Sequence, residues 1–348
     1  MTVALGASAY SVAVFHLMTH AFFKALLFLA AGSVIIGMHH NQDIRYMGGL
    51  RKYMPITWIT SLLGSLALIG TPLFSGFYSK DEVIMAVKAS TLPGAGFAYF
   101  AVMAGVFVTA FYSFRMYFLV FHGKERYDQN PDAHHDDHHG HDNHGHNEKP
   151  HESPWVITMP LVLLAIPSVF IGFMAIAPML FGEFFKDSIF VDGTKHMAMQ
   201  ELAKEFHGAA QLALHGLMTL PFWLALAGVG LSYYMYIVNP KLPAAIKLRV
   251  KPIYTLLENK YYVDWFNENV IARGARMLGT GLWKGGDETL IDGGLVNGSW
   301  KIVGVVSNFV RRAQTGYLYH YALVMMLGVF GLMTYFIGWP MLTLWLGK

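Results

Sequence analysis

The chain has 348 residues, of which 54% are hydrophobic and 14% are charged, and its mean hydropathy is +0.39. These values exceed those of ordinary water-soluble domains and predict an integral membrane protein. The net charge of only +3, together with the long apolar runs, excludes nucleic acid as a partner. The absence of cysteine excludes disulfides, Cys-ligated zinc and Cys-ligated iron–sulfur clusters.

Six apolar stretches are long enough to cross a bilayer, which takes about 20 helical residues. Because lipid offers no partner to backbone groups, each stretch should be helical, which predicts an all-α, polytopic transmembrane helix bundle. The stretches run from about Val3 to Met38, Pro55 to Leu73 with a continuation to about Lys88, Phe97 to Phe121, Trp155 to Phe181, about Ala209 to Val238, and Tyr321 to about Leu346.

These stretches and the segments between them predict five regions. We expect transmembrane helices in residues 1–121, a His-rich loop in 122–154, two further transmembrane helices in 155–238, an amphipathic segment in 239–316 and a final transmembrane anchor in 317–348. Lys and Arg gather in the connections at one membrane face, which should therefore be cytoplasmic. Both termini should then lie on the outer face.

The His-rich loop is a low-complexity stretch of His, Asp, Asn and Gly over residues 127–151. It has no apolar residues that could form a core, so we expect a disordered, solvated linker. A weaker alternative is a metal-collecting loop, but nothing in the sequence fixes a coordination geometry. Its candidate ligands are His134, His135, His138, His139 and His141.

The segment after residue 239 alternates apolar and charged residues at near-helical spacing, from Trp265 to Leu278. We expect this pattern to break at the glycine pairs 285–286 and 293–294 and to resume up to Arg312. Such a helix should lie along the cytoplasmic face of the membrane. Anchoring to lipid and bracing of neighbouring protein both remain open as its role.

The first apolar stretch contains His16, His20 and Lys24, which recur every four residues and therefore stack along one helix face. We call these three residues the ladder. Ionisable groups inside a membrane are costly and are therefore functional candidates. Imidazole has a reference pKa of about 6.5, so a histidine can gain and lose a proton near neutral pH. The ladder therefore suits a water-bridged proton relay. Two alternatives are a His–His metal site, which the Lys24 cation opposes, and two structural histidines bonded across helices.

The second stretch carries Gly70, Pro72 and Gly76 inside an apolar span. Proline removes a backbone donor and clashes with the preceding turn, so we expect the helix to break there. Broken helices at membrane depth mark ion pathways in transporters. Lys80 and Asp81 follow the break, and Lys80 is a candidate for passing a proton outward. The alternative is that Lys80 merely reaches the membrane surface from a shorter helix.

At these residues the chain resembles a known family. The sequences HLMTHAFFKALLFLAAGSVI, MGGLRKYMP, TPLFSGFYSKDE, YSFRMYFLVFHGKER and LENKYYVDWFNENV are similar to the C-terminal part of subunit L of proton-pumping NADH:quinone oxidoreductase, respiratory complex I. This subunit belongs to the antiporter-like membrane subunits. The resemblance implies that the ladder lies on a central hydrophilic axis, that Lys80 and Asp81 lie at an outward half-channel, and that residues 264–316 form much of a lateral helix.

The resemblance also implies partners and a location. It covers the last six spanning helices of a longer subunit, so the other half-channel would lie in missing N-terminal helices. Further expected partners are the other membrane-arm subunits and the lipid bilayer, and the expected location is the bacterial inner membrane. The complex is expected to carry FMN, iron–sulfur clusters and quinone elsewhere, with no cofactor on this chain. Its enzymatic role would be that of a translocase subunit.

Three other functions remain open from the sequence. Relatives of this family include subunits of multisubunit sodium/proton antiporters and of membrane-bound hydrogenases, which share the ladder and the broken helix. A second alternative is a non-conducting structural subunit of the membrane arm. A third is metal uptake through the His-rich loop.

Overall fold

The structure is a computed structural model, which describes residues 1–129, 149–186, 188–193 and 196–346. These residues form helices, and no β-strand occurs among them. Five helical segments in the described ranges are long and apolar enough to cross a membrane, which confirms the predicted all-α, polytopic class. They are Tyr10–Gly37, Ala95–Phe121, Trp155–Phe181, Leu220–Val238 and Leu318–Trp345. The remaining predicted stretch is divided into two shorter helices.

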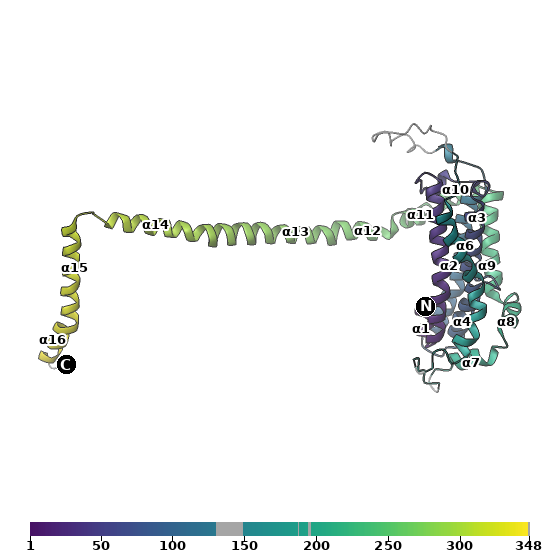
Figure 1. The fold of residues 1–348 in the computed structure, drawn as a ribbon, viewed down its shortest axis with the longest axis horizontal. Helices are drawn as coiled ribbons and strands as arrows, with labels where there is room; N and C mark the ends of the chain where they lie inside the picture. The colour runs from purple at the N-terminus through teal and green to yellow at the C-terminus, as the bar shows by residue number, and fades with distance from the viewer. Residues whose placement is uncertain (130–148, 187, 194–195, 347–348) are drawn as a thin grey trace. The chain divides into compact units, whose positions relative to one another are not determined.

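The chain forms two compact units, residues 1–249 and 250–348. Figure 1 shows the helices of the first unit running side by side as a bundle. Its α-helices are α1 (Thr2–Gly6), α2 (Tyr10–Gly37), α3 (Pro55–Ile69), α4 (Ser75–Ala89), α5 (Ala95–Phe121), α6 (Trp155–Ile176), α7 (Ala198–Glu205), α8 (Ala209–Gly216), α9 (Leu220–Tyr233) and α10 (Leu242–Arg249). Short 3-10 turns cover Ile44–Tyr46, Leu50–Lys52 and Tyr127–Gln129, and π-helical turns extend α6 over Ala177–Phe181 and α9 over Tyr234–Val238.

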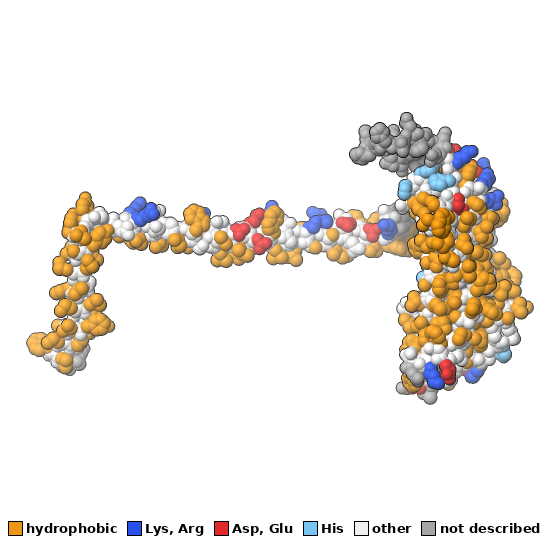
Figure 2. Space-filling view, viewed as in Figure 1, with side chains coloured by type: hydrophobic (Ala, Val, Ile, Leu, Met, Phe, Trp, Pro, Cys, Tyr) orange, Lys and Arg blue, Asp and Glu red, His pale blue; other side chains and the backbone are white. Residues whose placement is uncertain are grey.

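Helix α4 occupies the centre of the packing in the first unit. It contacts α2, α5 and α6 along its sides and α1, α7 and α8 near its end, while α2 packs on α3 and α6, and α5 packs on α9. Figure 2 shows apolar side chains over the middle of the bundle and charged side chains gathered towards its two ends. This distribution is typical of a bundle whose flanks meet lipid.

Two further predicted stretches are interrupted in the structure. The first is divided between α1 and α2, where Ser8 takes a left-handed backbone conformation with a φ of 57°. The fifth is divided between α8 and α9, where Thr219 precedes the helix and Pro221 lies in its first turn. Proline fits the first turn of a helix but cannot continue a preceding one, so a new helix starts there.

The start of α3 is held by an acidic side chain from a distant part of the sequence. Glu152 accepts hydrogen bonds from the backbone N–H groups of Ile56, at 2.8 Å, and Thr57, at 3.3 Å. The Thr57 hydroxyl donates to the same carboxylate at 2.6 Å and lies 2.8 Å from the Ser33 hydroxyl. A carboxylate satisfies the free N–H groups and the positive end of a helix, so Glu152 caps α3, while Thr57 connects the same turn to α2.

The second unit consists mostly of one long helical rod followed by a membrane-length helix. Its α-helices are α11 (Lys251–Glu258), α12 (Val263–Phe266), α13 (Arg273–Gly281), α14 (Asn297–Ala313), α15 (Leu318–Met333) and α16 (Trp339–Trp345). A 3-10 turn covers Lys260–Tyr262, and π-helical stretches cover Asn267–Ala272, Leu282–Val296 and Thr334–Gly338. In Figure 1, α12, α13 and α14 follow one another without interruption.

The predicted breaks at glycines 285–286 and 293–294 are wrong. All four glycines lie inside the π-helical stretch Leu282–Val296, and none has a positive φ. Glycine weakens a helix but does not end it unless the backbone leaves the helical region, and the wider π turn keeps these residues in the rod. Figure 2 shows charged side chains mostly along one edge of the rod and apolar ones along the other.

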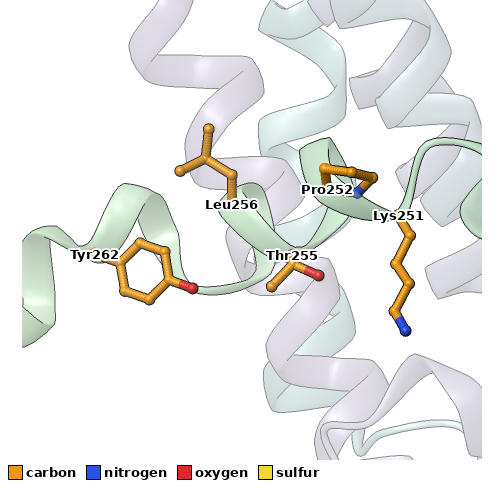
Figure 3. Close-up of a pocket in the computed structure, with 5 residues that line it drawn as sticks. All are labelled: Lys251, Pro252, Thr255, Leu256 and Tyr262. Carbon is orange, nitrogen blue, oxygen red and sulfur yellow. The ribbon is translucent and has the colours of Figure 1, made fainter.

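A shallow hollow lies at the start of the second unit, where Lys260, Tyr261 and Tyr262 all have positive φ values of 49° to 58°. Figure 3 shows the side chains that line it, which are Lys251, Pro252, Thr255, Leu256 and Tyr262. The side chains of Lys251 and Leu256 point in opposite directions. The hollow therefore does not gather polar groups around a common point, as a ligand site would.

Candidate functional site

The site is built around the gap between α3 and α4. Helix α3 ends at Ile69, and Gly70 adopts a left-handed φ of 79°, which glycine tolerates without a steric penalty. The N–H groups of Gly70 and Thr71 turn back to the carbonyls of Ala67, at 3.2 Å, and Leu66, at 3.1 Å. Pro72 lies in the gap, and α4 begins at Ser75. The two helices are therefore separated by a structured turn with its own hydrogen bonds.

Gly76 lets the two halves approach closely. A Cβ atom at this position would lie 1.8 Å from the carbonyl oxygen of Ala67, far inside van der Waals contact. Only glycine fits without a backbone shift. The first turn of α4 therefore packs directly over the last turn of α3.

Lys80 closes the gap from the side of α4. Its Nζ donates a hydrogen bond to the carbonyl of Leu68, in the last turn of α3. A helix C-terminus has free carbonyls and the negative end of the helix dipole, so it is a favourable place for an ammonium group. Lys80 is thus held at the helix break by the carbonyl end of α3.

The ladder residues lie on α2, beside α4. The rings of His16 and His20 have centroids 5.7 Å apart, and the ring of His20 also meets Phe23 edge-on at 5.3 Å. His16, His20 and Lys24 are each partly buried. The charge of Lys24 acts on both His20 and Lys80, so the ladder and the break lie within electrostatic reach of each other.

Two hydroxyl groups connect the ladder to α4. The Oγ of Ser79 lies 2.9 Å from Nδ1 of His16, and the Thr19 hydroxyl donates to the same Oγ at 2.7 Å. Ser79 and Thr19 are both fully buried. Ser79 directly precedes Lys80 in the chain, so this contact places the ladder next to the lysine of the break.

A small cavity borders Lys80 and Asp81. Its volume is about 20 Å³, enough for one water molecule, and its polar lining includes both of these side chains and Thr219. The full lining is Ile69, Gly70, Phe77, Lys80, Asp81, Ile84, Val106, Thr219, Pro221 and Phe222. A water in this cavity would extend the chain of polar groups beyond Lys80.

The acidic residues after Lys80 are buried. Asp81 is 8% exposed and Glu82 is 4% exposed. Among the described residues, neither carboxyl group has a hydrogen bond or an ion pair, and the ammonium group of Lys80 bonds to Leu68 instead. Lys80 therefore shares a cavity with Asp81 but is bonded to the Leu68 carbonyl.

Sequence reasoning placed the ladder, the break, Lys80 and Asp81 on the site and missed Ser79, Thr19 and Thr219. Hydroxyl side chains in apolar helices commonly bond to their own backbone, so their pattern gave no signal. The His-rich loop candidates, His134 to His141, lie outside the described residues. Within the part of the chain that is described, no group of three His, Cys, Asp or Glu residues could hold a metal ion.

Comparison with known proteins finds relatives of this chain. Residues 1–111 match the family described as "NADH:quinone oxidoreductase/Mrp antiporter, TM". Over 330 residues the chain is 60% identical to NADH-quinone oxidoreductase subunit L of Neisseria meningitidis serogroup B, covering 94% of this chain and 49% of that protein. The resemblance to subunit L of NADH-quinone oxidoreductase is confirmed.

More distant relatives have related names. The chain is 36% identical to subunit L of Rhodobacter capsulatus over 397 aligned residues, covering 96% of this chain and 53% of that protein. It is also 36% identical to NAD(P)H-quinone oxidoreductase chain 5 of Picosynechococcus over 371 aligned residues, covering 97% of this chain and 50% of the relative. The chain spans about half the length of these subunit L relatives.

Proposed function

We propose that this chain is a proton-translocating membrane-arm subunit of NADH:quinone oxidoreductase. The names of its relatives support the complex, and the geometry at the helix break supports the role. The observation that carries the proposal is that neighbouring residues of α4 join the two candidate elements. Ser79 bonds to His16 of the ladder, and Lys80 bonds to the end of α3.

In this proposal the protons move through the ladder, His16, His20 and Lys24, and leave by Lys80 and Asp81. The rings of His16 and His20, whose centroids lie 5.7 Å apart, make no direct hydrogen bond in the described structure, so a bridging water would carry the proton between them. Beyond Lys80, the cavity shared with Asp81 has room for one more water. The polar groups thus form a stepwise path across the broken helix.

The coupling in this proposal is electrostatic. Lys24 on α2 and Lys80 on α4 are cationic side chains on neighbouring helices, and like charges repel. A change of charge in a neighbouring subunit, driven by electron transfer elsewhere in the complex, would therefore move a proton from Lys24 towards Lys80. FMN, iron–sulfur clusters and quinone belong to the rest of the complex in this proposal, and this chain contributes no redox site.

The partners in this proposal are the other membrane-arm subunits, the lipid bilayer and the preceding helices of a longer subunit. The bacterial inner membrane is the proposed location, with both termini on the outer face. The proposed regions are 1–121 for the conducting helices, 155–238 for two supporting helices, 239–316 for a lateral helix and 317–348 for the anchor. Residues 122–154 are proposed to be a linker.

The test is proton translocation by the assembled oxidoreductase in liposomes. Lys24→Ala and Lys80→Ala should lower the number of protons moved per NADH oxidised, while the complex still assembles. Lys88→Ala is the matched control, since Lys88 lies on the same helix as Lys80 but is exposed. Unchanged translocation in both Lys24→Ala and Lys80→Ala would instead support a purely structural subunit.

Sodium/proton exchange is the second candidate, because the family description names the Mrp antiporter beside the oxidoreductase. A lysine at the break would carry a proton in either function, so the position of Lys80 fits both proton translocation and sodium/proton exchange. Translocation that is unaffected by replacing sodium with choline supports proton transport alone. Translocation that depends on sodium supports exchange.

A further inference from the structure

The proposed relay leaves one question about His16: which of its two ring nitrogens carries the hydrogen. The ring has a protein partner at Nδ1 alone, the Ser79 hydroxyl, since no hydrogen bond to Nε2 occurs among the described residues. The partner at Nδ1 decides the tautomer of a neutral histidine. The hydrogen bonds of Ser79 therefore determine the tautomer of His16.

Ser79 has one hydroxyl hydrogen and two acceptors within reach. Nδ1 of His16 lies at 2.9 Å, and the carbonyl of Gly76 lies at 3.4 Å, beyond the usual range for a hydroxyl donor. The Ser79 oxygen also accepts a hydrogen bond, which the Thr19 hydroxyl donates at 2.7 Å. The bond from Thr19 leaves the hydrogen of Ser79 directed at its better acceptor, which is Nδ1.

We infer that Ser79, oriented by Thr19, sets the tautomer of His16, so that the neutral ring accepts at Nδ1 and carries its hydrogen on Nε2. Ser79 is thus a positioning residue for the ladder. The Nε2–H group remains available to a water on the relay. This role deepens the proposed function and rests on it, but the tautomer itself can be measured without any transport.

The same arrangement accommodates the charged ring. When His16 gains a proton, both nitrogens carry hydrogen, and Nδ1 becomes a donor to Ser79. The Ser79 hydroxyl then turns to the carbonyl of Gly76, and Thr19 has the carbonyl of His16 as a second acceptor at 3.2 Å. One N–H bond forms with the added proton, and every other change is a hydroxyl rotation. The ring keeps a partner at Nδ1 in both charge states without turning.

Nitrogen NMR of ¹⁵N-histidine in the full chain, in lipid bilayers, tests the inference. The His16 signals are assigned by their loss in His16→Gln. At a pH where the ring is neutral, Nδ1 should show the unprotonated shift and Nε2 the protonated shift. The opposite assignment overturns the inference.

Thr19→Val is the decisive variant, because it keeps the shape of the side chain and removes the hydroxyl. Thr19 already donates to one lone pair of Ser79, so an Nδ1–H group would be the second donor to the same oxygen. Without the Thr19 hydroxyl it would be the first donor, so the share of the Nδ1–H tautomer should rise by up to about fivefold, the change that one ordinary hydrogen bond produces. Thr19→Ser should restore the wild-type tautomer, and Ser79→Ala should remove the preference. A Thr19→Val protein with wild-type tautomers contradicts the inference.

Ser75→Ala is the matched control. Ser75 is also a fully buried serine of α4, but its hydroxyl donates to the carbonyl of Ser168 at 2.6 Å. Its loss should leave the His16 tautomer unchanged, and a shift there would mean that any loss of packing in α4 disturbs the ring. Proton translocation by the assembled complex is measured separately. The tautomer result judges Ser79, and the translocation result judges the relay.

Discussion

The ammonium group of Lys80 donates a hydrogen bond to the backbone carbonyl of Leu68, across the gap between α3 and α4. One side chain therefore serves both structure and chemistry. It satisfies a carbonyl that the end of α3 leaves free, and it places an ionisable group at the helix break.

Removing the donor should destabilise the break. Lys80→Met retains the length and apolar stem of the side chain but leaves the Leu68 carbonyl without its partner. An unsatisfied buried carbonyl costs about 1–3 kcal/mol, so the thermal unfolding midpoint in bilayers should fall. Lys88→Met, at an exposed position of the same helix, should leave the midpoint unchanged. Equal midpoints in the two variants would mean that the Lys80 bond contributes nothing to stability.

The close approach at Gly76 should tolerate no side chain. Gly76→Ala places its methyl group against the Ala67 carbonyl, which forces the two helices apart, and we expect the complex to lose assembly. Gly32→Ala is the matched control, because a Cβ atom at Gly32 of α2 meets nothing within 4 Å. That change should be neutral or stabilise the protein by up to about 1 kcal/mol, since alanine favours helices. The amount of assembled subunit in membranes measures both.

The cap at the start of α3 should contribute to stability. Glu152→Ala removes the acceptor for Ile56, Thr57 and the Thr57 hydroxyl, and we expect a loss of about 1–2 kcal/mol, as for other helix caps. Glu183→Ala removes an exposed ion pair with Lys186 and should have little effect. The comparison is made on thermal unfolding midpoints. A midpoint for Glu152→Ala equal to that of Glu183→Ala argues against the cap.

One loop contact should depend on pH in a defined direction. The hydrogen bond from Lys52 holds the pKa of Glu125 below its ordinary value of 4.5, so the contact is fully present above about pH 4.5 and is lost as the pH falls through the lowered pKa. In the same region, the backbone N–H group of Gly49 donates to the backbone carbonyl of His122. After correction for intrinsic exchange, hydrogen exchange at Gly49 should stay slow down to the ordinary carboxyl range and rise only below it. Glu125→Gln should abolish this rise in exchange. A rise that begins above pH 4.5 would mean that the pKa of Glu125 is raised, which contradicts the prediction.

The sequence predicts those parts of the fold whose signal is local. Apolar runs of spanning length give the bundle, and the four-residue spacing of the ladder predicts one helix face. At the second stretch, Gly70 and Pro72 lie where α3 ends and the turn begins. The glycines of the rod were misread because glycine permits a break without requiring one, and the backbone there stays helical.

The contacts that connect these elements could not be predicted in the same way. Ser79 meets His16 across 63 residues, and the acceptor of Lys80 is a backbone carbonyl, which every residue possesses. Asp81 follows Lys80 in the chain, and the resemblance implies that both residues lie at an outward half-channel. On a helix, however, successive side chains point in different directions, and the bond goes to Leu68 instead.

The central claim is that Lys80 must gain and lose a proton, beyond holding the helix break together. Lys80→Arg separates these functions, because arginine keeps a donor for the Leu68 carbonyl but stays charged at all physiological pH values. The measurement is the number of protons moved per NADH oxidised by the assembled oxidoreductase in liposomes, beside Lys88→Arg. We predict normal assembly with lowered translocation for Lys80→Arg and wild-type translocation for Lys88→Arg. Wild-type translocation by the assembled Lys80→Arg complex would contradict the account.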